Sequence, residues 1–269
     1  MNASYSKNTI KPIFFGKSSK ELYGCYHLPK KSPVRNCGIV LCYPIGQEYI
    51  MSHRSFYNLA VQLSFQGFHV FRFDYWGCGD SAGEFEQGTL HQWVSDIQTA
   101  SNELTRRSGV SRISLLGLRM GATLAMMAAQ QNNDFDSLIL WEPILDGQRY
   151  VKELLEMQKL YSKHKKGKKK WASGMDEEIL GFPLTKELRQ SLEKIKAEKI
   201  VLPVGRNILT LCNDREDNCR ENLSRLLAVK PDLEWQSIRD HCVWREELYK
   251  RLIPAETIKY LIQWISRAY

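Results

Sequence analysis

The chain has 269 residues, of which 43% are hydrophobic and 25% are charged, and its formal net charge is +8. This is the composition of an ordinary globular protein, and the length fits one large domain or one domain with an insertion. No stretch reaches the ~18 consecutive apolar residues of a membrane-spanning helix. The segment from Met1 to Lys7 also lacks the apolar core of a signal peptide. The sequence therefore argues against an integral membrane protein and predicts a cytoplasmic location.

The cysteine content also predicts a cytoplasmic location. The cysteines are Cys25, Cys37, Cys42, Cys78, Cys212, Cys219 and Cys242. An odd number of cysteines, mostly inside apolar runs, favours reduced and buried thiols over a disulfide framework. No Cys-x-x-Cys pair is present, so we expect no zinc site, and the sequence indicates no other metal or cofactor.

The first 145 residues alternate between two patterns. Short apolar runs predict strands over residues 38–43, 68–74, 112–117 and 136–141. Apolar residues at helical spacing predict helices over residues 52–66, 90–104 and 120–131. Strands that alternate with helices through short connections indicate right-handed crossovers and a largely parallel sheet.

The pattern changes after Pro143. Residues 148–205 are charged and helical in spacing and contain no convincing strand, so they read as an insertion over one end of the sheet. The alternating pattern then resumes, with strands expected over 207–212 and 234–239 and helices over 218–229 and 246–268. We therefore expect a core domain made of residues 1–147 and 206–269, with residues 148–205 as a helical, lysine-rich insertion.

Positive charge is concentrated in this insertion. Residues 148–200 hold 14 Lys and Arg residues against 8 acidic residues, and the run from Lys163 to Lys170 is the densest part. Such a run steers anionic partners over long range, or it is simply a solvated loop. No nucleic-acid-binding motif accompanies the charge, so nucleic acid is not an expected partner.

Three short motifs carry a resemblance to a known superfamily. They are Tyr43-Pro-Ile-Gly-Gln-Glu48, Asp74-Tyr-Trp-Gly-Cys-Gly-Asp-Ser81 and Gly117-Leu-Arg-Met-Gly121. In their order and context they resemble the oxyanion loop, the D-x-x-G-x-G-x-S loop and the nucleophile elbow of α/β-hydrolases, in the monoacylglycerol-lipase and serine-aminopeptidase-like branch. The resemblance implies an α/β-hydrolase fold: a mostly parallel central sheet flanked by helices, with the insertion as a helical lid.

The elbow motif departs from that family at its central position. Where the G-x-S-x-G pattern has a serine, this sequence has Arg119. A guanidinium stays protonated in proteins and cannot attack a carbonyl carbon, which excludes an acyl-enzyme formed on this residue. An arginine at this position also resembles the type 2 hydrolases found with exosortase systems and related proteins of biosynthetic gene clusters.

The resemblance also implies other site residues. His241 follows a predicted strand where the family has its catalytic histidine, and Asp214, Glu216 and Asp217 follow another where the acid is expected. The sequence does not choose among these three carboxylates. The backbone amides of Ile45 and Met120 correspond to the family's oxyanion donors, and Gly46 lies in the same loop.

Three roles are open for Arg119. Its charge, just above a helix N-terminus, favours an anion there: a carboxylate, a phosphate or a developing oxyanion. Alternatively, Glu48 reaches Arg119 and the two form a buried ion pair. In the third interpretation, Glu48 or His241 activates water on a substrate that Arg119 holds, with no covalent intermediate.

Two functional hypotheses follow. The first is an enzyme that acts on an ester, thioester or related acyl substrate, with His241 as base and Arg119 holding charge. The basic insertion would suit an acyl group on an acidic carrier protein or a pantetheine arm. The second is a catalytically inactive pseudo-hydrolase that binds an anionic ligand or a protein partner. Aromatic residues of the insertion line an apolar acyl or aryl pocket, or form only the underside of a lid; they are Tyr150, Tyr161, Trp171 and Phe182.

Overall fold

The computed structural model describes residues 9–132, 134–164, 178–202, 206–213, 219–231, 233–242, 244 and 253–269. A single eight-stranded sheet forms its centre, in the order β1-β2-β4-β3-β5-β6-β9-β10. The strands are β1 (Ile10–Lys17), β2 (Lys20–His27), β3 (Gly38–Cys42), β4 (His69–Phe73), β5 (Ile113–Leu118), β6 (Ser137–Trp141), β9 (Asn207–Cys212) and β10 (Glu234–Ser237). From β4 to β10 neighbouring strands are parallel, while β1 and β2 add an antiparallel hairpin to the β4 edge. This is the mostly parallel sheet of the predicted α/β-hydrolase fold.

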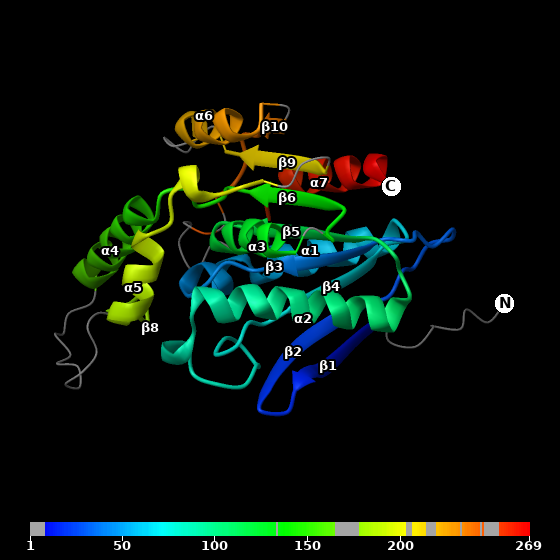
Figure 1. Cartoon of the computed structure of the whole chain (residues 1–269), viewed down its shortest axis with the longest axis horizontal. Coiled ribbons are helices and arrows are strands. Elements are labelled where there is room, and N and C mark those ends of the chain that lie inside the picture. The colour runs from blue at the N-terminus through cyan, green and yellow to red at the C-terminus, as the bar shows by residue number, and fades with distance from the viewer. Residues whose placement is uncertain are drawn as a thin grey trace.

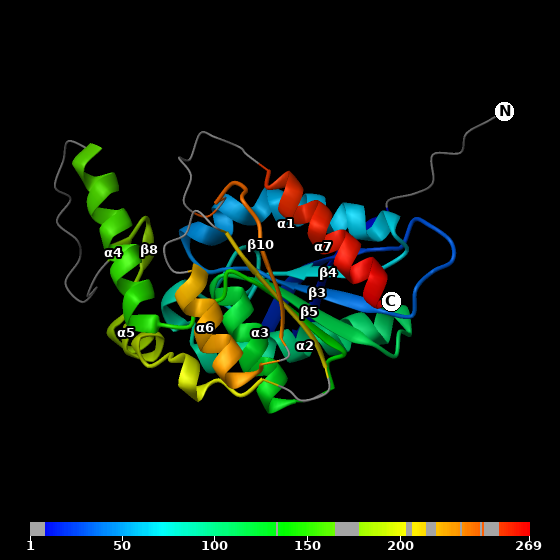
Figure 2. The same cartoon turned by 90° about the horizontal axis from the view of Figure 1, so that it is seen from above.

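The central strands are mostly apolar because both of their faces are covered. Every residue of β3, β5 and β6 is buried. Helices α1 (Gln47–Phe65) and α7 (Ala255–Ala268) pack on one face, as Figure 2 shows, and α2 (Leu90–Ser108), α3 (Met120–Gln131) and α6 (Cys219–Val229) on the other. Continuous apolar runs are what strands buried on both faces require.

The segment between β6 and β9 lies beyond the carboxyl ends of the parallel strands (Figure 1). It contains α4 (Gly147–His164), the two-residue strands β7 (Glu178–Ile179) and β8 (Phe182–Pro183), α5 (Lys186–Glu193) and a short 3₁₀ helix at Ala197–Lys199. The sequence predicted no strand here, and β7 and β8 are too short for alternation to signal them. We call the described parts of this stretch, residues 147–164 and 178–202, the β6–β9 segment. Most of the predicted basic run, residues 165–170, lies outside the described residues.

Three further differences from the sequence prediction have local causes. The β1–β2 hairpin was not predicted. Helix α1 begins at Gln47 rather than Ser52, because Gly46 takes a φ of 60° and turns the chain directly into the helix. Helix α7 begins after Pro254, which has no backbone N–H to donate within a helix; the predicted start at residue 246 lies outside the described residues.

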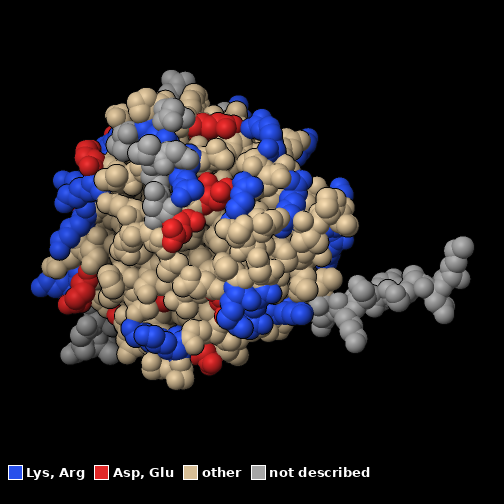
Figure 3. Space-filling model, turned by 45° about the vertical axis from the view of Figure 1, so that its right-hand side comes forward, with Lys and Arg blue, Asp and Glu red and all other residues tan. Residues whose placement is uncertain are grey.

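Three more general features concern the described helices, the cysteines and the surface. None of the described helices is long and apolar enough to cross a membrane. Cys25, Cys37, Cys42 and Cys78 are free cysteines. On the face drawn in Figure 3, Lys and Arg side chains form several separate groups rather than one continuous patch.

Candidate functional site

Arg119 occupies a tight turn between β5 and α3, at the carboxyl edge of the sheet. Its backbone has φ 53° and ψ −121°, a conformation that L-residues rarely adopt. The start of α3 lies so close to the loop after β3 that a Cβ on Gly121 would sit 2.2 Å from the carbonyl oxygen of Cys42. Only glycine fits there. A strained strand-to-helix turn at the top of the sheet is the local geometry that G-x-S-x-G motifs build.

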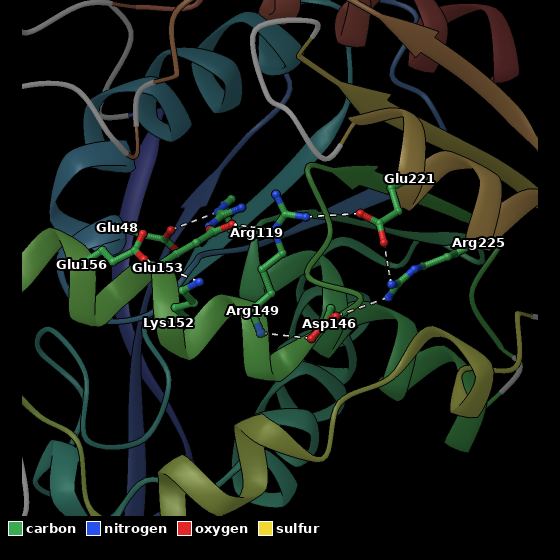
Figure 4. A network of polar contacts seen from close by, with 9 residues as sticks. All are labelled: Glu48, Arg119, Asp146, Arg149, Lys152, Glu153, Glu156, Glu221 and Arg225. Atoms are coloured by element: carbon green, nitrogen blue, oxygen red, sulfur yellow. Dashed lines mark hydrogen bonds and ion pairs between the residues drawn. The ribbon is translucent and has the colours of Figure 1, made fainter.

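Two carboxylates hold the side chain of Arg119 (Figure 4). Its Nε donates to Oε1 of Glu48 over 3.0 Å, and its Nη2 donates to Oε2 of Glu153 over 2.9 Å. Arg119 is 5% exposed. Burial alone would lower the pKa of the guanidinium, but Glu48 and Glu153 outweigh burial and raise it, so Arg119 keeps its charge. The ion pair with Glu48, one of the three roles open for Arg119, is therefore present.

Glu48 is also buried, in the first turn of α1. Its Oε2 accepts a hydrogen bond from the hydroxyl of Tyr150 over 3.0 Å, so both carboxylate oxygens have a donor. Burial raises the pKa of Glu48, and the opposing effect of Arg119 is smaller. A carboxyl group with a raised pKa can take up a proton closer to neutral pH than an exposed one.

The ion pairs continue from the elbow into the β6–β9 segment and α6. Glu153 of α4 lies 3.6 Å from Arg149, which also pairs with Glu221 at 3.2 Å. Glu221 in turn pairs with Arg225 of α6 at 2.7 Å. Figure 4 shows this chain of charges running from α1 through the elbow to α4 and α6. The β6–β9 segment is thus attached to the core through the elbow arginine.

Two aromatic rings pack against the guanidinium of Arg119. The ring of Tyr150 lies 5.4 Å from it and the ring of Trp244 lies 5.7 Å from it. Trp244 in turn meets Trp141, at the end of β6, edge to face. Because Trp244 follows β10, this contact brings the loop that carries His241 to the same end of the sheet as Arg119.

The backbone around His241 is anchored by Asp240. The carboxylate of Asp240 accepts hydrogen bonds from the backbone amides of His241 (2.8 Å) and Thr257 (2.9 Å), and its carbonyl accepts from the side chain of Asn213 (2.7 Å). The loop after β10 is therefore tied to the ends of β9 and α7. The predicted orienting carboxylates, Asp214, Glu216 and Asp217, lie outside the described residues.

Two cavities meet at Tyr150. An apolar one, with about 370 Å³ of empty space open to solvent, includes Ile45 and Gly46 in its lining. A smaller polar one of about 230 Å³ is lined by Arg119, Glu153 and Arg149 among others. Tyr150 and Phe182, two of the predicted pocket aromatics, line the apolar cavity; Met120 is fully buried. Among the described residues, no group of His, Cys, Asp and Glu side chains could hold a metal ion.

Sequence reasoning missed several parts of this site. Glu153 was counted only as one of the acidic residues in the insertion, and Trp244 was not considered. Glu142 was also missed: it is buried, has φ 50° and accepts a hydrogen bond from the backbone amide of Asn213. Asp214, Glu216 and Asp217 were selected because they are carboxylates that follow a parallel strand. Glu142 follows β6 in the same way, so the same criterion could have identified it.

The sheet order, the helices on both faces and the strained turn after β5 define an α/β-hydrolase fold. Solved structures share it over nearly their whole length. Est1E from Butyrivibrio proteoclasticus with bound ferulic acid matches with a TM-score of 0.67 and 14% identity, over 95% of this chain and 98% of that chain. A proline iminopeptidase from Mycobacterium smegmatis gives 0.66 and 12%, over 96% and 98%. An esterase from Pyrococcus furiosus gives 0.62 and 15%, over 96% and 90%.

The family follows from the sequence itself. A family model described as serine aminopeptidase S33 matches residues 49–198, which is more than half of the chain. The protein therefore belongs to the serine aminopeptidase S33 family and is a hydrolase-type enzyme. A search of curated protein sequences gave no significant match.

Proposed function

We propose that the chain is an acyl hydrolase that works without a serine nucleophile. The observation that carries the proposal is the arrangement of Arg119, a buried guanidinium fixed by two carboxylates at the strained turn after β5. Its third nitrogen, Nη1, has no hydrogen-bond partner among the described residues, and Arg119 lines the polar cavity. A donor held rigidly in this way can stabilise the oxygen of a substrate carbonyl as negative charge develops on it.

The carboxylates set what Arg119 can bind. Because two carboxylates, Glu48 and Glu153, already pair with its one positive charge, a neutral carbonyl that becomes negative only in the transition state suits the site better than a permanent anion. Arg119 then stabilises the transition state more than it stabilises the bound substrate, and this difference lowers the activation barrier. This favours an ester, thioester or related acyl substrate over a phosphate or carboxylate ligand.

In the proposed reaction, water attacks the carbonyl carbon and His241 takes the proton of that water. The carbonyl oxygen becomes the oxyanion near Arg119 and the amides of Ile45 and Met120. When the tetrahedral intermediate collapses, the bond to the leaving alkoxide or thiolate breaks, and His241 returns the proton to it. One of Asp214, Glu216 and Asp217 would orient His241. The arginine in the elbow also supports a place beside the exosortase-associated type 2 hydrolases.

The apolar cavity next to Ile45 and Gly46 would receive the acyl group. The basic composition of residues 148–200 supports an acyl group carried on an acidic protein or a pantetheine arm, because opposite charges steer such partners together. Simple esters and acyl-pantetheine thioesters therefore make the right substrate panel.

The test compares hydrolysis of this panel by the wild-type protein and two histidine variants. Under the proposal, His241→Gln lowers kcat at least about 100-fold, the lower end of general-base contributions. His91→Gln, at an exposed position on α2, leaves kcat unchanged. Mass spectrometry during turnover detects no acylated protein. Full activity in His241→Gln, or an acyl-enzyme, rejects the proposal.

A second candidate is an inactive binding protein of the same fold. The observation that favours it is the same pair of carboxylates, because a balanced ion pair also acts as a purely structural link between α1, the elbow and α4. Under this candidate, the wild-type protein turns over nothing in the panel, while an acyl-pantetheine raises its Tm in proportion to the logarithm of concentration.

A further inference from the structure

Arg72, in β4, is a buried cation that forms no ion pair with the residues that the structure describes. Its residue is 7% exposed, and no carboxylate lies within ion-pairing distance of it in the part of the chain that the structure describes. Moving a charge out of water without an opposite charge is unfavourable, and interior charges are normally paired. Arg72 therefore needs an explanation that apolar packing does not supply.

The hydrogen bonds of Arg72 are directed at two neutral side chains. Its Nε donates to Nε2 of His27 over 3.0 Å, and its Nη1 donates to the hydroxyl oxygen of Tyr43 over 2.9 Å. Burial, together with Arg72 itself, lowers the pKa of His27 to about 3, so this imidazole is neutral and Nε2 is free to accept. The face of the Tyr57 ring lies 5.3 Å from the guanidinium and adds a favourable cation–π contact.

Tyr43 is the residue through which Arg72 reaches the candidate site. It follows β3 directly and begins the loop that leads through Ile45 and Gly46 into α1. Its ring is stacked on Phe56 at 4.4 Å and meets Tyr49 edge-on at 5.0 Å, while the hydrogen bond from Arg72 holds its far end. The ring is thus fixed both by packing and by a directed bond.

The loop itself needs such support. Gly46 has φ 60° and ψ −137°, a conformation that residues other than glycine rarely adopt, and glycine has no side chain to hold the backbone there. Two residues later, Glu48 must meet Arg119. A phenylalanine at position 43 with an apolar residue at position 72 would fill the same space without burying a charge. Arg72 instead adds a directional hydrogen bond, which fixes the orientation of the Tyr43 ring.

We propose that Arg72 is a positioning residue that acts through Tyr43. It holds the loop so that the amide of Ile45 faces the substrate carbonyl oxygen. This inference rests on the proposed function for its catalytic part, while its structural part, the order of the loop, is measurable on the protein alone.

The experiment compares two variants that each remove one buried phenol hydroxyl. Tyr43→Phe loses the acceptor for Arg72, whereas Tyr26→Phe loses a hydroxyl on β2 that bonds to His69 at the start of β4, away from the loop. Hydrogen exchange is measured at the amides of residues 45–48, together with kcat and KM for an activated ester. A third variant, Arg72→Lys, keeps the charge but cannot reach both acceptors.

Tyr43→Phe is expected to speed exchange at residues 45–48 about tenfold and to lower kcat about tenfold with KM unchanged, a fraction of the loss seen when an oxyanion donor is removed. Arg72→Lys shows the same pattern, and Tyr26→Phe shows neither change. Unaltered exchange in Tyr43→Phe overturns the inference, and so does faster exchange with unaltered kcat. Faster exchange in a protein whose wild type hydrolyses nothing supports the ordering of the loop and rejects the proposed function instead.

Discussion

The guanidinium of Arg119 and the carboxylate of Glu48 form an ion pair between the elbow and the first turn of α1, with Nε and Oε1 3.0 Å apart. Glu48 is 1% exposed and Arg119 is 5% exposed, so neither charge can turn to water if the other is removed. An interior ion pair of this kind is costly to break, even where its net contribution relative to an apolar pair is small. The first two predictions follow from this.

Glu48→Gln should destabilise the protein far more than Glu153→Gln. Both substitutions remove one carboxylate from Arg119, but Glu48 is fully buried whereas the side chain of Glu153 is 17% exposed. We expect a loss of about 3 kcal/mol in the free energy of unfolding for Glu48→Gln and about 1 kcal/mol for Glu153→Gln. Urea unfolding of the two variants checks this, and equal losses would show that burial does not govern the pair.

Restoring a serine at the elbow should need two changes. Arg119→Ser alone leaves Glu48 buried without its partner, so the single variant should be unstable and inactive. Arg119→Ser combined with Glu48→Gln removes both charges and leaves the strained turn in place. We expect this double variant to hydrolyse p-nitrophenyl acetate with an acyl-enzyme burst, because a serine hydroxyl would then stand at the top of the turn. A stable double variant without a burst would mean that His241 does not reach position 119.

Most of the fold could be predicted from the sequence because its pattern is local. Strands β3, β5 and β6 are buried on both faces and therefore appear as apolar runs, and helix α3 matches its predicted range. The β1–β2 hairpin shows less of this pattern, because much of β1 is exposed. The paired glycines of Gly117-Leu-Arg-Met-Gly121 indicated the tight turn, since this glycine pattern can be recognised within five residues of sequence.

The partners of Arg119 were only partly predictable, for a physical reason. Glu48 could be proposed because the loops after β3 and β5 end at the same edge of a parallel sheet. The contact of Arg119 with Glu153 depends instead on how α4 is oriented over that edge, which no local pattern in α4 specifies. The position of Trp244 against Arg119 is set in the same way, by the path of the loop after β10.

The stability of the protein should depend on pH through His27. Burial, and then Arg72, lower its pKa from the ordinary 6.5 to about 3. Between these values the unfolded chain takes up a proton that the folded protein does not. Stability is therefore fully present above about pH 6.5 and is lost as the pH falls, at about 1.4 kcal/mol per pH unit from this residue. The measurement is the free energy of unfolding of wild type and His27→Gln at pH 7.5 and pH 5. Wild type should lose about 2 kcal/mol more than the variant. Identical losses would show that His27 is not the group responsible.

The β6–β9 segment should loosen when its contact with the elbow is removed. Glu153 is the residue of α4 that reaches Arg119, and Arg149 holds the same helix to α6 through Glu221. Because these contacts lie at different points, Glu153→Gln should speed hydrogen exchange in α4 while β5 and β6 stay protected. Exchange measured by mass spectrometry over residues 147–164 tests this. Glu156→Gln, whose partner Lys152 is exposed on the same helix, is the matched control and should have little effect, since exposed pairs contribute little. If both variants exchange like the wild type, packing of α4 on α5, rather than the elbow arginine, holds the segment in place.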